Sequence, residues 1–194
     1  MEIEGSFYLN ITVYSGANRG NQAIFEQSAI ELGSWIAKNN NTLVYGGGKA
    51  GLMGSLADTV LHSGGKAIGV IPTFLKNREL AHQNLTKLYV VESMSERKDK
   101  MASLAEAFIA LPGGPGTLEE ITEMVSWARI GQNPNPCIFY NVNNYYGAIE
   151  NFYDHMVINE FLTKEDRSKI LFSSSFDEIN SFIENYEPPL VRQY

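Results

Sequence analysis

The stretch Ala107–Glu120 constrains the fold more than any other part of this 194-residue chain. It begins with an apolar run typical of a buried strand, passes through a glycine-rich turn and then starts a helix. Glycines let a backbone approach a ligand closely, and a helix N-terminus presents unpaired N–H groups with partial positive charge. The sequence therefore predicts a phosphate-binding turn, followed by a helix that carries Glu119 and Glu120 in its first turn.

Strand-like and helix-like segments alternate along the rest of the chain. Strands are expected at Tyr8–Tyr14, Thr42–Tyr45, Ala67–Ile71, Lys87–Val91, Phe108–Leu111, Cys137–Tyr140 and Ile170–Phe172. Helices are expected at Asn21–Asn39, Leu52–His62, Ser95–Glu106, Leu118–Ile130, Tyr145–Asn159 and Phe176–Tyr186. This order predicts an α/β fold with a parallel sheet covered by helices on both faces. We expect one domain over residues 1–194, with loose termini at 1–6 and 187–194.

Composition disfavours several classes of protein. A net charge of −7 disfavours a broad nucleic-acid surface, which needs a basic face. No apolar run approaches the roughly 18 residues of a membrane span, and the short acidic N-terminus lacks a signal-peptide pattern. The single cysteine, Cys137, lies in a strand-like run, so we expect it in the core of a protein from a reducing compartment, the cytoplasm.

A first glycine cluster also follows a strand. Gly46, Gly48 and Gly51 match the G-x-G-x-x-G pattern of dinucleotide-binding folds. That pattern needs an acidic residue about 20 positions later, and no carboxylate lies between Asp58 and Glu79. A P-loop is excluded because the residue after Gly51 is not lysine. Two interpretations remain: a tight packing turn, or a loop that approaches the sugar or phosphate of a mononucleotide.

Simple structural roles also exist for the residues around the second glycine cluster, which consists of Gly113, Gly114 and Gly116. Thr117 and Glu120 have the spacing of a capping box, in which both side chains close the start of a helix. Arg97 and Lys98 have the pattern of a solvated helix face. The apolar residues of Leu118–Ile130 suit either a core helix or a dimer contact.

Residues Pro112–Glu120 match the signature P-G-G-x-G-T-x-x-E, and on that basis the chain resembles the LONELY GUY (LOG) family. The family consists of cytokinin riboside 5′-monophosphate phosphoribohydrolases, often mislabelled as lysine decarboxylases. The resemblance runs from about Tyr8 to Phe182. It includes Tyr14–Gly16, Leu43–Gly48, Gly51–Gly54, Gly69–Pro72, Glu79 with His82, and Met94–Lys98.

The resemblance implies a Rossmann-like, doubly wound sheet and a homodimer with its site near the interface. It implies hydrolysis of the N-glycosidic bond of nucleoside 5′-monophosphates, with Arg97 and Glu120 as the catalytic pair. The substrate or phosphate contacts that it implies are Gly46, Gly47, Glu79, Lys98, Gly113, Gly114, Gly116, Thr117 and Ser126. Ser95 stands where the family commonly has histidine, and this departure bears on base preference more than on reaction type.

The residues permit a simple mechanism. Breaking a ribosyl–nitrogen bond develops positive charge on the sugar, which the Glu120 carboxylate would stabilise, or it would deprotonate the attacking water. We expect no cofactor, because no pattern supports pyridoxal phosphate, and no metal, because His62, His82 and His155 lack ligand spacing. The alternative is a non-catalytic nucleotide or cofactor carrier on the same fold.

Overall fold

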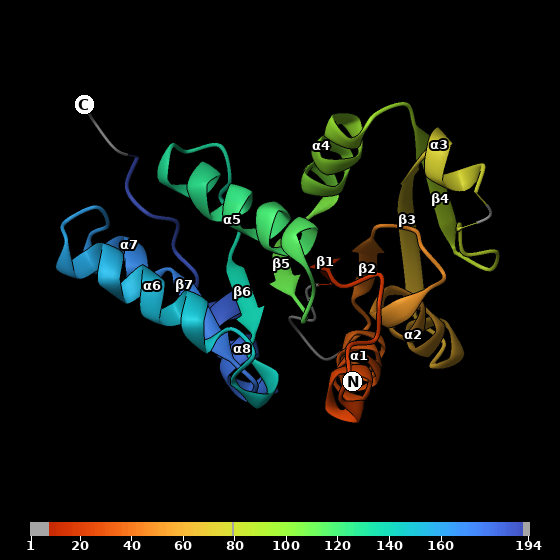
Figure 1. Ribbon diagram of the computed structural model, residues 1–194, viewed down its shortest axis with the longest axis horizontal. Coiled ribbons are helices and arrows are strands. Elements are labelled where there is room, and N and C mark those ends of the chain that lie inside the picture. Colours follow the sequence, from red (N-terminus) through yellow and green to blue (C-terminus); the bar gives the residue numbers. More distant parts are fainter. Residues whose placement is uncertain (1–7, 79, 192–194) are drawn as a thin grey trace, which may run out of the picture.

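The computed structural model of the chain describes residues 8–78 and 80–191 (Figure 1). Its centre is a seven-stranded, all-parallel sheet with the order β4-β3-β2-β1-β5-β6-β7. The strands are β1 (Asn10–Tyr14), β2 (Thr42–Tyr45), β3 (Lys66–Pro72), β4 (Lys87–Val91), β5 (Ala107–Ala110), β6 (Cys137–Tyr140) and β7 (Ile170–Ser173).

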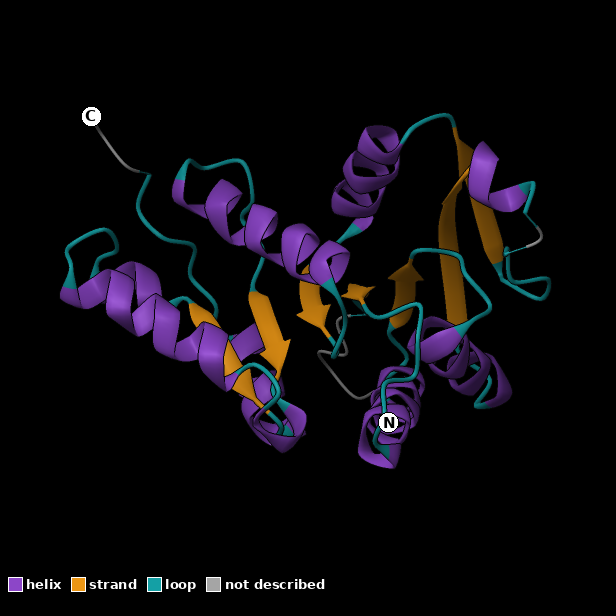
Figure 2. Ribbon diagram, viewed as in Figure 1, coloured by secondary structure: helices purple, strands orange, loops and turns teal. Residues whose placement is uncertain are grey.

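Helices cover both faces of this sheet, as Figure 2 shows in purple around the orange strands. They are α1 (Ala23–Lys38), α2 (Gly51–His62), α3 (Thr73–Lys76), α4 (Met94–Leu104), α5 (Pro115–Arg129), α6 (Gly147–Ile158), α7 (Lys164–Ser168) and α8 (Phe176–Glu184), with a 3-10 turn η1 (Val142–Asn144). The predicted α/β architecture is confirmed.

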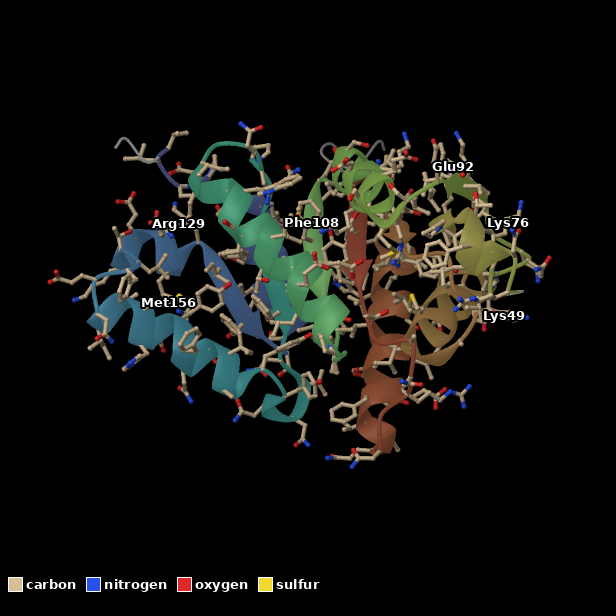
Figure 3. The ribbon with its side chains drawn as sticks, turned by 45° about the horizontal axis from the view of Figure 1, so that its top comes forward. Lys49, Lys76, Glu92, Phe108, Arg129 and Met156 are labelled. Carbon is tan, nitrogen blue, oxygen red and sulfur yellow. The ribbon has the colours of Figure 1, made fainter. Side chains whose placement is uncertain are left out.

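Each face of the sheet has its own hydrophobic core. On one face, α1, α2 and α8 pack residues such as Leu32, Leu56 and Ile179 against β1 and β2. On the other, α4, α5 and α6 pack against β5 and β6, around Phe108, which is labelled in Figure 3. Burying apolar area on both faces stabilises the fold, and it explains why the central strands are mostly apolar.

The order of the strands determines where a ligand site can form. From β1 the chain winds outward through β2 and β3 to β4, and then returns to place β5 on the other side of β1. The connections that leave the carboxyl ends of β1 and β5 therefore diverge to opposite faces. In open parallel sheets this divergence makes a crevice that binds ligands.

The main difference from the sequence-based prediction lies at α5. The helix begins at Pro115 rather than Leu118, because proline has its φ preset and needs no N–H donor at the first helical position. Four of its apolar residues, Ile121, Met124, Val125 and Ala128, are buried in the core, whereas Ile130, the C-cap after the helix, is exposed. The core interpretation of this helix is therefore correct for most of its apolar side chains.

Only part of the two predicted loose ends belongs to the described residues. Residues 1–6 and 192–194 lie outside the described residues, so the loose ends expected there stay a prediction. Residues 187–191 form no helix or strand, yet Pro189 is buried. Within the part of the chain that the structure describes, no helix is both long and apolar enough to span a bilayer.

Cys137 gives a direct test of the core. Burial raises the pKa of its thiol to about 12, and the side chain is 2% exposed. Because the thiolate is the reactive form, we expect no reaction with a thiol-specific disulfide reagent at pH 8 in the native protein. One thiol should react after unfolding in urea. Rapid stoichiometric labelling of the native protein would contradict this placement.

Candidate active site

A cavity of about 560 Å³ opens where the connections that follow β1 and β5 diverge. Its walls come from the β1–α1 loop, the first residues of α2 and α4, and the β5–α5 turn. The predicted residues that line it are Arg97, Gly113, Gly114, Gly116, Thr117 and Glu120. Six of the eleven predicted site residues are thus brought together around one space.

Three helix N-termini meet this cavity without a side chain to close them. The N-cap residues of α1, α2 and α5 are Gln22, Ala50 and Gly114, and none makes a side-chain cap hydrogen bond. A fourth helix at the cavity, α4, is capped by Ser93, which accepts from the Glu96 N–H. Thr163 and Ser175 cap α7 and α8, whose residues do not line the cavity. Uncapped N–H groups carry partial positive charge, so this cavity attracts an anion.

The glycines of the β5–α5 turn have two different roles. A Cβ on Gly113 would collide with the side chain of Thr117, so this glycine permits the tight approach of the turn to the helix. A Cβ on Gly114 or Gly116 would meet nothing within 4 Å. The backbone at these two positions therefore borders open space, where a ligand has room to approach.

The capping-box interpretation of Thr117 and Glu120 is wrong. Because α5 begins at Pro115, both residues lie inside the helix, and its first turn contains no acidic residue. The N-cap is Gly114, which has no side chain with which to close the helix. The Glu120 carboxylate is therefore not used for capping and lines the cavity instead.

Arg97 and Glu120 form a buried ion pair beside this helix end. The Nη1 atom of Arg97 lies 3.7 Å from Oε1 of Glu120, and about a tenth of each side chain is exposed (11% and 10%). The Arg97 Nε–H also donates to the carbonyl oxygen of Val70, at the end of β3, over 3.3 Å. Gly46 makes room for the guanidinium, which a Cβ at that position would strike.

Burial and neighbouring charges act in opposite directions on Glu120. Burial raises the pKa of its carboxyl above the ordinary glutamate value, and the positive charge of Arg97 opposes that rise. Glu119 and Glu123 raise the pKa further, while Lys98 lowers it. The charged form of such a carboxylate is destabilised by desolvation, and any positive charge that develops close to it stabilises that form.

Lys98 points to the helix beside it rather than into the cavity. Its ammonium lies 2.6 Å from Glu119 and 3.1 Å from Glu123, and its hydrogen bond to Glu119 raises the pKa of the lysine. It does not line the cavity. Lys98 therefore neutralises acids on α5, and its predicted contact with substrate stays a prediction.

The remaining predicted contacts lie outside the cavity wall or outside the described residues. Gly47 has φ +74° and accepts a hydrogen bond from the His82 backbone N–H, as expected of a packed turn. Ser126 is exposed on α5 and does not line the cavity, and neither do Gly46 and Gly47. Glu79 lies outside the described residues. The proposed ligand contacts of these residues stay predictions.

Sequence reasoning missed the contribution of the β1–α1 loop and of one tyrosine. Asn18 and Arg19 come from that loop, and Tyr145 comes from the connection between β6 and α6. The loop residues follow the carboxyl end of β1, so strand order alone places them at the crevice. Nothing local in the sequence marks Tyr145, because the residue with which it makes a hydrogen bond is 32 positions away.

Comparisons with known proteins fit this geometry. The family described as "Possible lysine decarboxylase" matches residues 53–182. A protein of Rhodococcoides fascians named cytokinin riboside 5′-monophosphate phosphoribohydrolase is 43% identical over 84% of this chain and 82% of its own length. LOG1 of Arabidopsis thaliana, with the same name, is 40% identical over 97% of this chain and 88% of its own. The chain belongs to the LOG family.

Solved structures with the same fold include more distant proteins. A molybdenum cofactor carrier protein from Chlamydomonas reinhardtii aligns with a TM-score of 0.69 at 17% identity, over 92% of this chain and all of that one (100%). The structure named TM1055 aligns with a TM-score of 0.68 at 18% identity, over 92% of this chain and 99% of its own. At these identities the likeness shows the Rossmann-like LOG and carrier fold alone.

The titration of Glu120 tests the electrostatics of the pair without reference to activity. We expect its carboxyl, followed by carbon-detected NMR, to titrate above the ordinary glutamate pKa of about 4.3, because burial disfavours the charged form. In Arg97→Gln the opposing cation is removed, so the pKa should rise further. A lower pKa in the variant than in the unaltered protein would contradict the assignment.

Proposed function

We propose that this LOG-family protein is a hydrolase that cleaves the N-glycosidic bond of purine nucleoside 5′-monophosphates, including cytokinin riboside 5′-monophosphates. The products are a free base and ribose 5-phosphate. One observation carries the proposal: the buried Arg97–Glu120 pair lines the same cavity as the uncapped N-terminus of α5. One end of this cavity suits a phosphate, and a carboxylate lies beside it.

The phosphate binds at the β5–α5 turn. Its oxygens accept hydrogen bonds from the backbone N–H groups of Gly114, Gly116 and Thr117, because Pro115 has no N–H and no Cβ blocks the approach at 114 or 116. Because the phosphate is remote from the bond that breaks, its binding energy fixes the position of the sugar. This positioning brings the anomeric carbon to the catalytic pair.

Glu120 acts on the sugar. As the bond between ribose and base breaks, positive charge grows on the sugar, and a desolvated carboxylate stabilises that charge more strongly than one in water. The same carboxylate accepts a proton from the attacking water, whose oxygen bonds to the anomeric carbon, while the base leaves with the electron pair of the broken bond and takes up a proton from water. Arg97 favours the ionised form of Glu120 against the effect of burial, and it holds the carboxylate from the β3 side through its bond to Val70.

The base lies against the apolar part of the cavity. Phe25, Leu52, Met53 and Met94 line it together with the polar loop of β1–α1. An apolar wall accepts a purine ring, and methionine side chains adapt to substituents of different shape. The names of the relatives support a cytokinin substrate among the purine nucleotides.

We infer that the protein works in the cytoplasm as a homodimer with a single domain per chain. Its unpaired, buried Cys137 suits a reducing compartment. Exposed apolar side chains, Ile158 and Phe161 among them, supply surface for a second copy. Light scattering on the purified protein should give about twice the 21.6 kDa mass of one chain.

Glu120→Gln tests the catalytic role. It removes the negative charge but keeps the shape of the side chain, so we expect kcat for AMP or N6-prenylated AMP to fall about 10²- to 10⁴-fold. Release of base and of ribose 5-phosphate is measured by chromatography. The matched control is Glu123→Gln, the same change one helical turn later at a residue that does not line the cavity; it should retain activity.

Two outcomes would overturn the proposal. One is a pure, folded protein with no turnover of AMP, GMP, CMP or prenylated AMP. The other is equal loss of activity in Glu120→Gln and Glu123→Gln, which would point to a general effect on α5. A nucleotide that binds and stays uncleaved over days would support a carrier instead.

A further inference from the structure

Three successive carbonyl groups of the β5–α5 turn are each held by a different donor. The Leu111 carbonyl accepts from the Tyr146 hydroxyl at 2.6 Å, the Pro112 carbonyl from the Gly16 N–H at 3.1 Å, and the Gly113 carbonyl from the Tyr145 hydroxyl at 2.6 Å. Two adjacent tyrosines therefore bond to this turn, one on each side of Pro112.

Holding a carbonyl also fixes the N–H of the same peptide unit. The described peptide bonds are all trans, and in a planar trans peptide the N–H points opposite to the C=O. The Tyr145 hydroxyl thus determines where the N–H of Gly114 points. Among the described residues, no acceptor is recorded for that N–H.

The neighbouring tyrosine has no such effect. The carbonyl that Tyr146 holds belongs to the peptide between Leu111 and Pro112, and proline has no N–H. Tyr146 is also buried, at 3% exposed, whereas Tyr145 is 41% exposed and lines the cavity. Two adjacent side chains of the same type therefore make equal bonds with different consequences.

The chain around Tyr145 holds its side chain in this position. Asn143 and Asn144 adopt left-handed backbone conformations, with φ of 51° and 56°, which asparagine tolerates better than most residues. The Asn141 side chain accepts from the Tyr146 N–H at 2.7 Å and closes this turn. The ring of Phe25 then meets the Tyr145 ring edge to face, at 5.5 Å between centroids.

We propose that Tyr145 is a positioning residue that aims the Gly114 N–H at a phosphate monoester in the cavity. The inference rests on the proposed function, because it assigns the phosphate to this turn. Tyr145 acts through the backbone. Its hydroxyl holds the Gly113–Gly114 peptide plane before the ligand arrives, so less conformational entropy is lost when the phosphate binds.

Tyr145→Phe tests this role, with Tyr146→Phe as the matched control. Each change removes one hydroxyl and keeps the ring. Calorimetric titration would measure the affinity for ribose 5-phosphate and, separately, for adenine, and urea unfolding would measure stability. All titrations are run at a temperature where every variant is folded.

For Tyr145→Phe we expect affinity for ribose 5-phosphate to fall about five- to tenfold, the effect of one lost hydrogen bond and its preorganisation. Affinity for adenine should stay within about twofold, because the base does not contact the turn. For Tyr146→Phe the opposite pattern is expected: a lower unfolding midpoint, since a buried carbonyl loses its donor, with unchanged affinity for ribose 5-phosphate.

An amide NMR measurement gives a second readout. Ribose 5-phosphate should shift the Gly114 amide proton strongly in the unaltered protein and in Tyr146→Phe, and much less in Tyr145→Phe. A purely structural role for Tyr145 would not select this amide, nor would it distinguish a phosphate ligand from adenine.

The results separate two kinds of failure. If the unaltered protein binds ribose 5-phosphate and Tyr145→Phe binds it equally well, the inference is wrong and the proposed function stands. Equal losses for ribose 5-phosphate and adenine, or equal losses in both tyrosine variants, also overturn the inference. If the unaltered protein binds no ribose 5-phosphate, the proposed function fails, and the inference fails with it.

Discussion

The rest of the site depends on the desolvated pair of Arg97 and Glu120. A glutamate side chain with about a tenth of its surface exposed is costly to keep charged, and the arginine 3.7 Å away offsets part of that cost. The pair requires α4 and α5 to approach at the edge of the cavity, and it requires glycine at position 46 to leave room for the guanidinium. Because the carboxylate lacks full solvation, developing positive charge on a substrate stabilises it.

The sheet order makes this arrangement possible. β1 and β5 are neighbours, yet the connections that follow them go to opposite faces, which opens the crevice between the β1–α1 loop and the β5–α5 turn. Helix N-termini from both faces then border the same space, so a chain with a net charge of −7 presents a locally positive site. Local backbone dipoles outweigh the global charge at short range.

Much of the fold follows from the sequence because it rests on local patterns. Apolar runs identify the strands, and helical spacing identifies the longer helices. The exact start of α5 is harder to predict from the sequence, since both Pro115 and Thr117 are acceptable near a helix N-terminus. In the structure α5 begins at Pro115, and Glu120 therefore has no capping role. The short helix α7 carries no strong periodic pattern and was not predicted.

The candidate site was predictable in part. The signature at Pro112–Glu120 and the basic pair nearby indicate phosphate and catalysis, but they do not show which of Arg97 and Lys98 faces the cavity. Successive helical residues point in different directions, and only the packing of α4 on α5 directs Lys98 to Glu119 and Glu123. The hydrogen bond of Tyr145 joins it to Gly113, 32 residues earlier in the sequence, and no local sequence pattern predicts such a contact.

A crystal structure of Glu120→Gln with intact AMP tests the central claim most directly, because this variant should bind the nucleotide without cleaving it. The account predicts the phosphate against the N–H groups of residues 114, 116 and 117 and the anomeric carbon beside the side chains of residues 97 and 120. A phosphate held elsewhere, with the sugar turned away from residue 120, would contradict it.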